Sequence, residues 1–223
     1  MPEFSGRRFS IGIMLLLVCA DAMSATQADT LADQLRAGKN RPEREAAALA
    51  LVALGSSEAK DALVAIVADI NVKANAREIA LSKLSAVMLA QVTTQDVKRI
   101  VIARDYKSDV YNAALQHLAP AVKLDEPTIV EVLEVYRAGA RKSAVLICCQ
   151  AQHAKFAKDP SQKALLNRVV GPFLLTAARA PVESAEVLDY LGWCLVEYGL
   201  PGGPEVLIRS LREQKAADEG EGV

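Results

Sequence analysis

The sequence predicts an all-α protein, and two features of its composition carry that expectation. Hydrophobic residues make up 52 % of the 223 residues but aromatic residues only 4 %, and alanine and leucine dominate the apolar set. Alanine and leucine favour helices, whereas strands prefer β-branched and aromatic residues. A chain of this length buries a substantial core, in one large domain or two small ones. We therefore expect about eleven helices of ordinary length and no strand.

The first 25 residues have the layout of a secretory signal. Arg7 and Arg8 precede the apolar run IGIMLLLVCA, and small residues cluster within positions 20–25. The apolar run is about half of the roughly 20 residues that span a bilayer. Residues 1–25 are therefore predicted to be a cleaved signal peptide, which makes the mature chain periplasmic or secreted with no membrane span. A lipoprotein signal, with lipid attached to Cys19, is the alternative.

Capping residues and prolines mark regular helix starts through the rest of the chain. The capping side chains accept hydrogen bonds from the free N–H groups of the first turn, and proline is suited to that turn because it has no N–H that needs a partner. Glycines after Leu54, Ala138 and Tyr198 suit the left-handed residue that ends a helix. The expected starts are at Asn40, Thr94, Ser108, Asp125, Ser161, Ser184 and the PGGP segment over 201–204.

One helix sequence recurs along the chain. REAAALAL over 44–51 and REIALSKL over 77–84 share arginine, glutamate, alanine and leucine, at a spacing of 33 residues from Arg44 to Arg77. YNAALQHL over 111–118 continues the register without its arginine, and RKSAVLIC over 141–148 restores arginine and alanine. A fifth copy near 184–191 is weak. A fixed period of this length indicates a repeat architecture, in which each helix pair is one unit.

The pattern of an apolar helix, Asp69 near its end, and then Arg, Ala and Leu opening a second helix resembles HEAT repeats and the related short bacterial HEAT-like repeats. The resemblance covers roughly residues 30–212. It implies a right-handed α-solenoid of about five antiparallel helix pairs, the second helix of each pair lining the concave side. The helix over 205–215 would be a terminal cap. We expect the solenoid domain over 26–215 and a disordered acidic tail over 216–223.

The repeated residues are expected to serve packing. The alanines allow helices to approach closely, the leucines fill the core, and the arginines satisfy carbonyls or a nearby acid such as Asp69. The residues concerned are Ala47, Ala80 and Ala144, then Leu51, Leu84 and Leu118, and finally Arg44, Arg77 and Arg141.

The segment SAVLICCQAQHAKFAKD over 143–159 holds two adjacent cysteines and one of the chain's two histidines. Residues three, four and seven apart share a helix face. This spacing places Cys148 on an apolar stripe, at the position of a core leucine, and places Cys149 and His153 on a mixed stripe nearer the concave groove. The apolar stripe is Ala140, Ala144, Ile147, Cys148, Ala151 and Ala154; the mixed stripe is Lys142, Leu146, Cys149 and His153.

Three chemistries are open to these residues. Cys194 could form a disulfide with Cys148, or alternatively with Cys149, in an oxidising compartment. Cys149 with His153 could act as a nucleophile and its base. A zinc site needs three or four ligands, and no motif organises His117 or Cys194 into one, so we expect no metal and no cofactor.

The sequence favours binding over catalysis. It contains no GxSxG elbow, phosphate-binding glycine loop or HExxH motif. Some HEAT-like repeat proteins are enzymes that carry His-Glu pairs on several helices, and no His-Glu dipeptide occurs in this sequence. With 26 basic and 27 acidic residues, the chain lacks the basic excess of nucleic-acid binders, so no nucleic acid is expected as a partner.

The expected function is therefore a non-catalytic protein- or peptide-binding scaffold in the periplasm or cell envelope. The alternatives are a lipid-anchored structural component of the envelope and an enzyme that uses Cys149 with His153. The residues expected to contact the partner on the concave face are Glu78, Ser82, Asn112, Gln116, Lys142 and His153.

Overall fold

The computed structural model describes residues 25–180 and 184–220, and this part of the chain is all-helical, with no strand. The expected all-α class is thereby confirmed, whereas the solenoid of antiparallel helix pairs stays a prediction. The predicted signal peptide, with Cys19, lies outside the described residues except for its last residue. The described chain divides into two compact units, one ending at Gln91 and the other beginning at Val92. That both belong to one repeat domain over 26–215 stays a prediction.

Capping residues mark some of the helix ends in the first unit. Residues 25–37 form its first helix. The later elements are α2 (Arg41–Leu54), α3 (Ser57–Ala68), α4 (Ala74–Ala86) and a 3₁₀ turn, η1 (Leu89–Gln91). Asn40 accepts a bond from the Glu43 amide at 2.9 Å to begin α2, and Gly55 ends it in the left-handed conformation at φ 62°. α2, α3 and α4 pack on one another.

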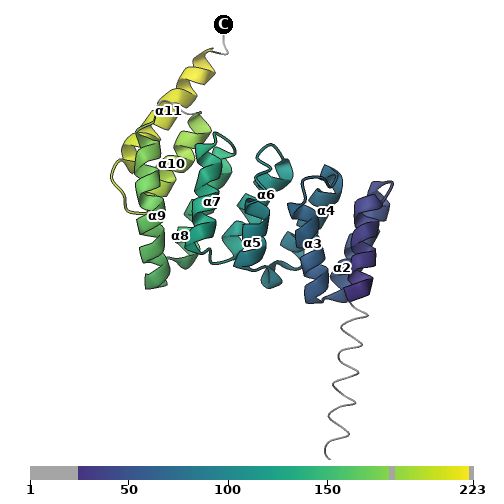
Figure 1. Cartoon of the computed structure of the whole chain (residues 1–223). Helices are drawn as coiled ribbons and strands as arrows, with labels where there is room; N and C mark the ends of the chain where they lie inside the picture. Colours follow the sequence, from purple (N-terminus) through teal and green to yellow (C-terminus); the bar gives the residue numbers. More distant parts are fainter. Residues whose placement is uncertain (1–24, 181–183, 221–223) are drawn as a thin grey trace, which may run out of the picture. The chain divides into compact units, whose positions relative to one another are not determined.

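The second unit holds α5 (Thr94–Val101), α6 (Asp109–His117), a 3₁₀ turn η2 (Ala119–Ala121), α7 (Glu126–Arg137), α8 (Lys142–Phe156), α9 (Pro160–Ala178), α10 (Ala185–Glu197) and α11 (Gly203–Gly220). Its helices make two layers (Figure 1). α5, α7 and α9 pack in succession, as do α6, α8 and α10, and α11 packs on α10. None of the described helices combines the length and hydrophobicity needed to cross a membrane.

Two helix starts differ from the sequence prediction. α5 is capped by Thr93 rather than Thr94, because Asp96 three residues later bonds the Thr93 amide at 2.9 Å and completes a capping box. α9 is capped by Asp159 rather than Ser161, because Pro160 already occupies its first turn. The starts at Ser108, Asp125 and Ser184 are confirmed, and each side chain accepts a first-turn N–H. The positive φ of Gly139 and Gly199 also agrees with the prediction.

The C-terminal helix is longer than predicted. α11 runs to Gly220, so residues 216–220 of the expected disordered tail are helical, while 221–223 lie outside the described residues. Ala216 and Ala217 are strong helix formers, and no glycine or proline interrupts the helix before Gly220. The helix propensity of these residues therefore outweighs the disorder that the acidic composition predicted.

The repeated arginines serve the helix packing, as expected. Arg77 is buried, and its Nε donates to the Val67 carbonyl, ten residues earlier, at 3.0 Å. Arg44 donates to the Asn75 side chain at 3.1 Å. The Oδ1 of Asp69, the acid proposed as a partner, accepts bonds from the amide and side chain of Asn71.

Tyr111 explains how the third copy functions without its arginine. The Tyr111 hydroxyl donates to the Val101 carbonyl at 3.0 Å, again ten residues earlier. Arg141 in the fourth copy reaches further back, to the carbonyls of Tyr106 at 2.9 Å and Lys107 at 2.6 Å. Arg77, Tyr111 and Arg141 thus occupy equivalent positions in the repeat, and each donates to a backbone carbonyl although the side chains differ.

A buried glutamine holds the turn between α6 and α7. Gln152 of α8 is 2 % exposed, and its Nε2 donates to the carbonyls of Ala119 and Val122 at 2.8 Å each. Its Oε1 accepts from the Leu124 amide at 3.3 Å. Gln162 of α9 is also buried, and it donates to the Leu124 carbonyl at 3.0 Å. These bonds satisfy backbone groups that would otherwise be buried without partners.

We predict that Gln152→Leu lowers the free energy of unfolding by about 2–4 kcal/mol, because it deprives three backbone groups of their partner and two of these hydrogen bonds are buried. Chemical denaturation of the variant measures the loss. Gln150→Leu is the matched control, since Gln150 lies on the same helix and is half-buried. Equal losses for the two variants would contradict the role given to Gln152.

α10 and α11 approach each other closely at two glycines. A Cβ on Gly192 would lie 2.6 Å from Cγ and 2.7 Å from Cδ2 of Leu207, and one on Gly203 would lie 2.8 Å from Cγ2 of Val196. Contacts this short are not tolerated, so both positions require the absence of a side chain. The glycines therefore set how near α11 lies to α10.

Gly192→Ala should lower the free energy of unfolding by about 1–3 kcal/mol through overpacking against Leu207. The Leu207→Ala background removes the two nearest atoms, so the same glycine change should cost less there. A double-mutant cycle by denaturation measures this coupling. An identical cost of Gly192→Ala in both backgrounds would show that Leu207 does not impose the glycine.

Candidate functional site

α8 and α10 lie side by side in one layer of the second unit and are joined by three polar contacts. The Cys194 thiol donates to the Leu146 carbonyl at 3.2 Å, and the Tyr198 hydroxyl donates to the Cys149 carbonyl at 2.9 Å. Further along, Nδ1 of His153 faces Oε1 of Glu197 at 3.4 Å. Glu197 and Tyr198 follow Cys194 on α10, and their partners His153 and Cys149 follow Leu146 on α8, so the two helices run side by side in the same direction.

The cysteines and the histidine form the wall between these helices. Cys148, Cys149 and Cys194 are 1 %, 3 % and 0 % exposed. His153 is also buried, and its ring lies 4.3 Å from the Tyr198 ring, centre to centre. Sequence analysis is correct that Cys148 belongs to the core. The expectation that Cys149 and His153 lie near a groove is wrong, because α10 covers that side of α8.

The accessible side of α8 differs from the predicted one by one residue along the helix. One row of accessible side chains follows the face one position later than the mixed stripe and consists of Ser143, Ile147, Gln150, Ala151 and Ala154. Lys142, Lys155 and Phe156, nearer the helix ends, are also at least partly accessible. One residue is about 100° of rotation in an α-helix. Ala151 and Ala154, predicted to be core, therefore lie on the accessible side, whereas Leu146 is fully buried.

The other expected contact residues are distributed over both units. Glu78 and Ser82 are exposed on α4 in the first unit. Asn112 and Gln116 are half-buried on α6, and Lys142 is half-buried at the start of α8 with its Nζ 5.2 Å from the centre of the Tyr136 ring. Five of the six predicted residues are thus at least partly accessible, and His153 is the exception.

The predicted Cys148–Cys194 disulfide is not formed in the structure, where all three described cysteines are free. The Cys194 sulfur is instead engaged with the Leu146 carbonyl. Burial raises the pKa of Cys148 and of Cys194 to about 12, and it raises the pKa of Cys149 well above its ordinary value. A thiol with such a pKa stays protonated at neutral pH and is a poor nucleophile.

The described cysteine, histidine and acidic side chains do not converge on a metal position. Within residues 25–180 and 184–220, no group of three such side chains is placed to hold an ion. Nε2 of His153 is buried and has no hydrogen-bond partner in the described part of the chain, while Nδ1 faces Glu197. The cluster therefore offers one oriented imidazole beside protonated thiols.

The accessible surface that sequence analysis missed centres on Trp193. This residue, the chain's one tryptophan, is 49 % exposed on α10, and Val196 one turn later is 45 % exposed. Glu186 and Glu197 lie on the same exposed side of the helix. We call Trp193, Val196 and the accessible residues of α8 (Ser143, Ile147, Gln150, Ala151 and Ala154) the Trp193 face. Trp193 lies two residues from both Leu191 and Leu195, which places it on the opposite side of the helix from these buried leucines. This spacing in the sequence would have indicated that the tryptophan faces outward.

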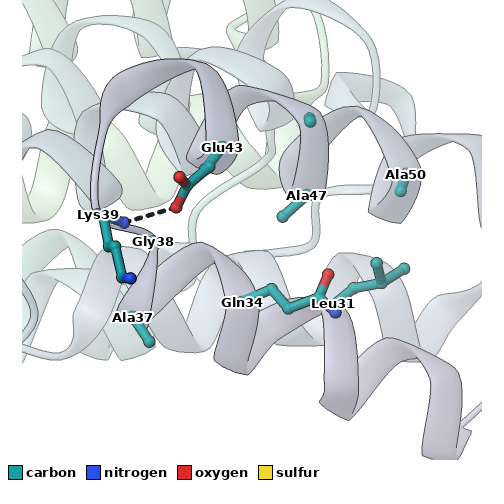
Figure 2. Close-up of a pocket in the computed structure, with 9 residues that line it drawn as sticks. Leu31, Gln34, Ala37, Gly38, Lys39, Glu43, Ala47 and Ala50 are labelled. Carbon is teal, nitrogen blue, oxygen red and sulfur yellow. Dashed lines mark hydrogen bonds between the residues drawn. The ribbon is translucent and has the colours of Figure 1, made fainter.

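The first unit contains a hollow between the helix over 25–37 and α2, shown in Figure 2. It encloses about 530 Å³. Leu31 and Gln34 lie on one side and the small side chains of Ala47 and Ala50 on the other, and the Lys39 amide donates to Glu43 at 2.8 Å at one end. Its walls are mostly apolar, with the charged side chains of Lys39 and Glu43 at that end.

Comparisons of the chain with family models, curated proteins and solved structures found no match. We therefore infer function from the side chains described above.

Thiol labelling of the native protein should leave Cys148, Cys149 and Cys194 unmodified until the chain unfolds, because each sulfur is enclosed and protonated. We expect labelling to be at least about 100-fold slower than in the denatured chain. Mass spectrometry of the cysteine-containing peptides reads each site separately. Native Cys149 that reacts as fast as denatured Cys149 would contradict this assignment and restore the nucleophile hypothesis.

Proposed function

We propose that this chain is a non-catalytic scaffold that binds a protein or peptide partner, built as an α-solenoid of the HEAT-like kind. The succession of helix contacts in the second unit supports this architecture, because α5, α7 and α9 follow one another in one layer and α6, α8 and α10 in the other. The carbonyl bonds of Arg77 and Tyr111 at equivalent register positions also support a repeat. Stacked pairs of this kind present an extended face to a partner.

The observation that carries the binding proposal is the exposed Trp193. Its indole lies on a helix that is packed against α8, α9 and α11, so binding would not have to order the backbone beneath it. Tryptophan is enriched among the residues that contribute most to interfaces, and it buries a large area with few rotatable bonds. An exposed tryptophan beside Val196 therefore suits an anchor for an apolar side chain of the partner.

The surroundings of Trp193 indicate what kind of peptide would fit. Ala151 and Ala154 on the neighbouring helix α8 are small and at least partly accessible. Glu186 and Glu197 supply negative charge on the same side of α10. A segment with one large apolar residue flanked by lysine or arginine complements this face.

Two further parts of the proposal concern compartment and chemistry. Arg7 and Arg8 before an apolar run support export to the periplasm or beyond the cell. The raised pKa of the buried Cys149 thiol supports a non-catalytic role for that cysteine.

Selection of peptides from a displayed library on the purified chain tests the proposal. Selected peptides should be apolar and basic, and they should change the emission of Trp193. Trp193→Ala should weaken binding by about 2 kcal/mol or more, roughly 30-fold in Kd by calorimetry.

Ile102→Ala is the matched control, because Ile102 is 50 % exposed at the end of α5, in the other layer. It should leave the affinity unchanged. Peptides that bind Trp193→Ala as tightly as the unchanged chain would refute the assignment of the binding face.

A further inference from the structure

The last helix, α11, is only partly covered by the rest of the second unit. Among its described residues Gly203, Val206 and Ser210 are buried, and the Ser210 hydroxyl donates to the Ala185 carbonyl, at the start of α10, at 2.9 Å. Beyond Ser210 the helix continues to Gly220, and its end extends past α10 (Figure 1). No side chain described in this later part is buried. Because short helices without packing are marginally stable in water, this end of α11 gains stability from a helix that packs on it.

The outward face of α11 is apolar at its centre. Ile208 is 50 % exposed, and Leu211 one turn later is 63 % exposed, the largest fraction among the exposed large hydrophobic residues of the described chain. Pro204 and Lys215 are also exposed and extend this row at its two ends. Steps of four, three and four residues between these positions are the spacing of the seam between two packed helices. The outward face therefore has the pattern that a second helix covers.

Glu205 and Arg212 decide which helix fits. Both are exposed, and they lie seven residues apart, so they flank the apolar row on the same side. When two α11 helices pack antiparallel, with Ile208 of one opposite Leu211 of the other, this flank of each helix meets the same flank of its partner. Glu205 of each copy then lies within about 3 Å, measured along the helix axis, of Arg212 of the other. In a parallel pair the flank instead meets the side of Leu207, which carries no charge.

We propose that two copies of this chain associate through the outward faces of α11, antiparallel and about a two-fold axis. Ile208 of each copy contacts Leu211 of the other, and Glu205 of each pairs with Arg212 of the other. Two helix faces form a small interface, so the dimer is weak and depends on concentration. This surface goes beyond the proposed binding function and uses no residue of the Trp193 face, so either can fail without the other.

Sedimentation equilibrium of the purified full chain, from about 1 µM to about 1 mM, tests the proposal and should show monomers in equilibrium with dimers. Ile208→Glu should raise the dimer Kd by about 30-fold or more, because it places a charge in the apolar contact. Ile102→Glu is the matched control, since Ile102 is also 50 % exposed but lies at the end of α5. It should leave the dimer Kd unchanged.

Charge exchange on α11 tests the orientation with variants that leave the apolar row intact. Glu205→Arg and Arg212→Glu should each raise the dimer Kd by about 5-fold, because each places like charges opposite one another, and the double variant should restore the original Kd. The proposal is overturned if the chain stays monomeric, if it forms larger open assemblies instead of dimers, or if Ile208→Glu dimerises as well as Ile102→Glu. It is also overturned if the double variant is no better than the two single ones.

Discussion

The second unit depends on the three hydrogen bonds that Gln152 makes from the centre of α8. They hold the backbone between Ala119 and Leu124, where the chain turns from α6 into α7. A turn that approaches a buried helix this closely has to satisfy its polar groups, and a single primary amide supplies two donors and an acceptor. With that turn fixed, α8 contacts α6, α7, α9 and α10, and it becomes the central helix of the unit.

The central position of α8 determines whether its cysteine and histidine side chains are accessible to solvent. Because α10 covers one side of α8, Cys149 and His153 are enclosed together with Cys194 and Tyr198. Enclosure raises the thiol pKa values and removes the access that a nucleophile needs. On α10, the neighbours Gly192 and Cys194 are turned inward, so Trp193 between them faces solvent. The same packing that makes the thiols inert therefore produces the exposed tryptophan.

Local chemistry made much of the fold predictable. Asn40, Ser108, Asp125 and Ser184 cap helices in the structure because a capping side chain bonds the amides beside it, whatever the rest of the chain does. The arginine register was also visible, since Arg77 serves its own helix pair. The role of Tyr111 could not be predicted in this way, because a tyrosine and an arginine are unlike in sequence although each bonds the carbonyl ten residues earlier. The accessible face of α8 was missed by one residue, since helix periodicity cannot show which flank a distant helix will cover.

We expect a partner to bind on the accessible side of α8 and α10 and to leave the buried Cys148, Cys149 and Cys194 undisturbed. Hydroxyl-radical footprinting of the chain with and without a selected peptide distinguishes the possible binding faces, because it reports the exposure of individual side chains. The peptide should protect Trp193, Val196 and Ile147, with no change at Ile102 or Val130. Protection of Ile102 and Val130 while Trp193 stays as reactive as in the free chain would contradict it.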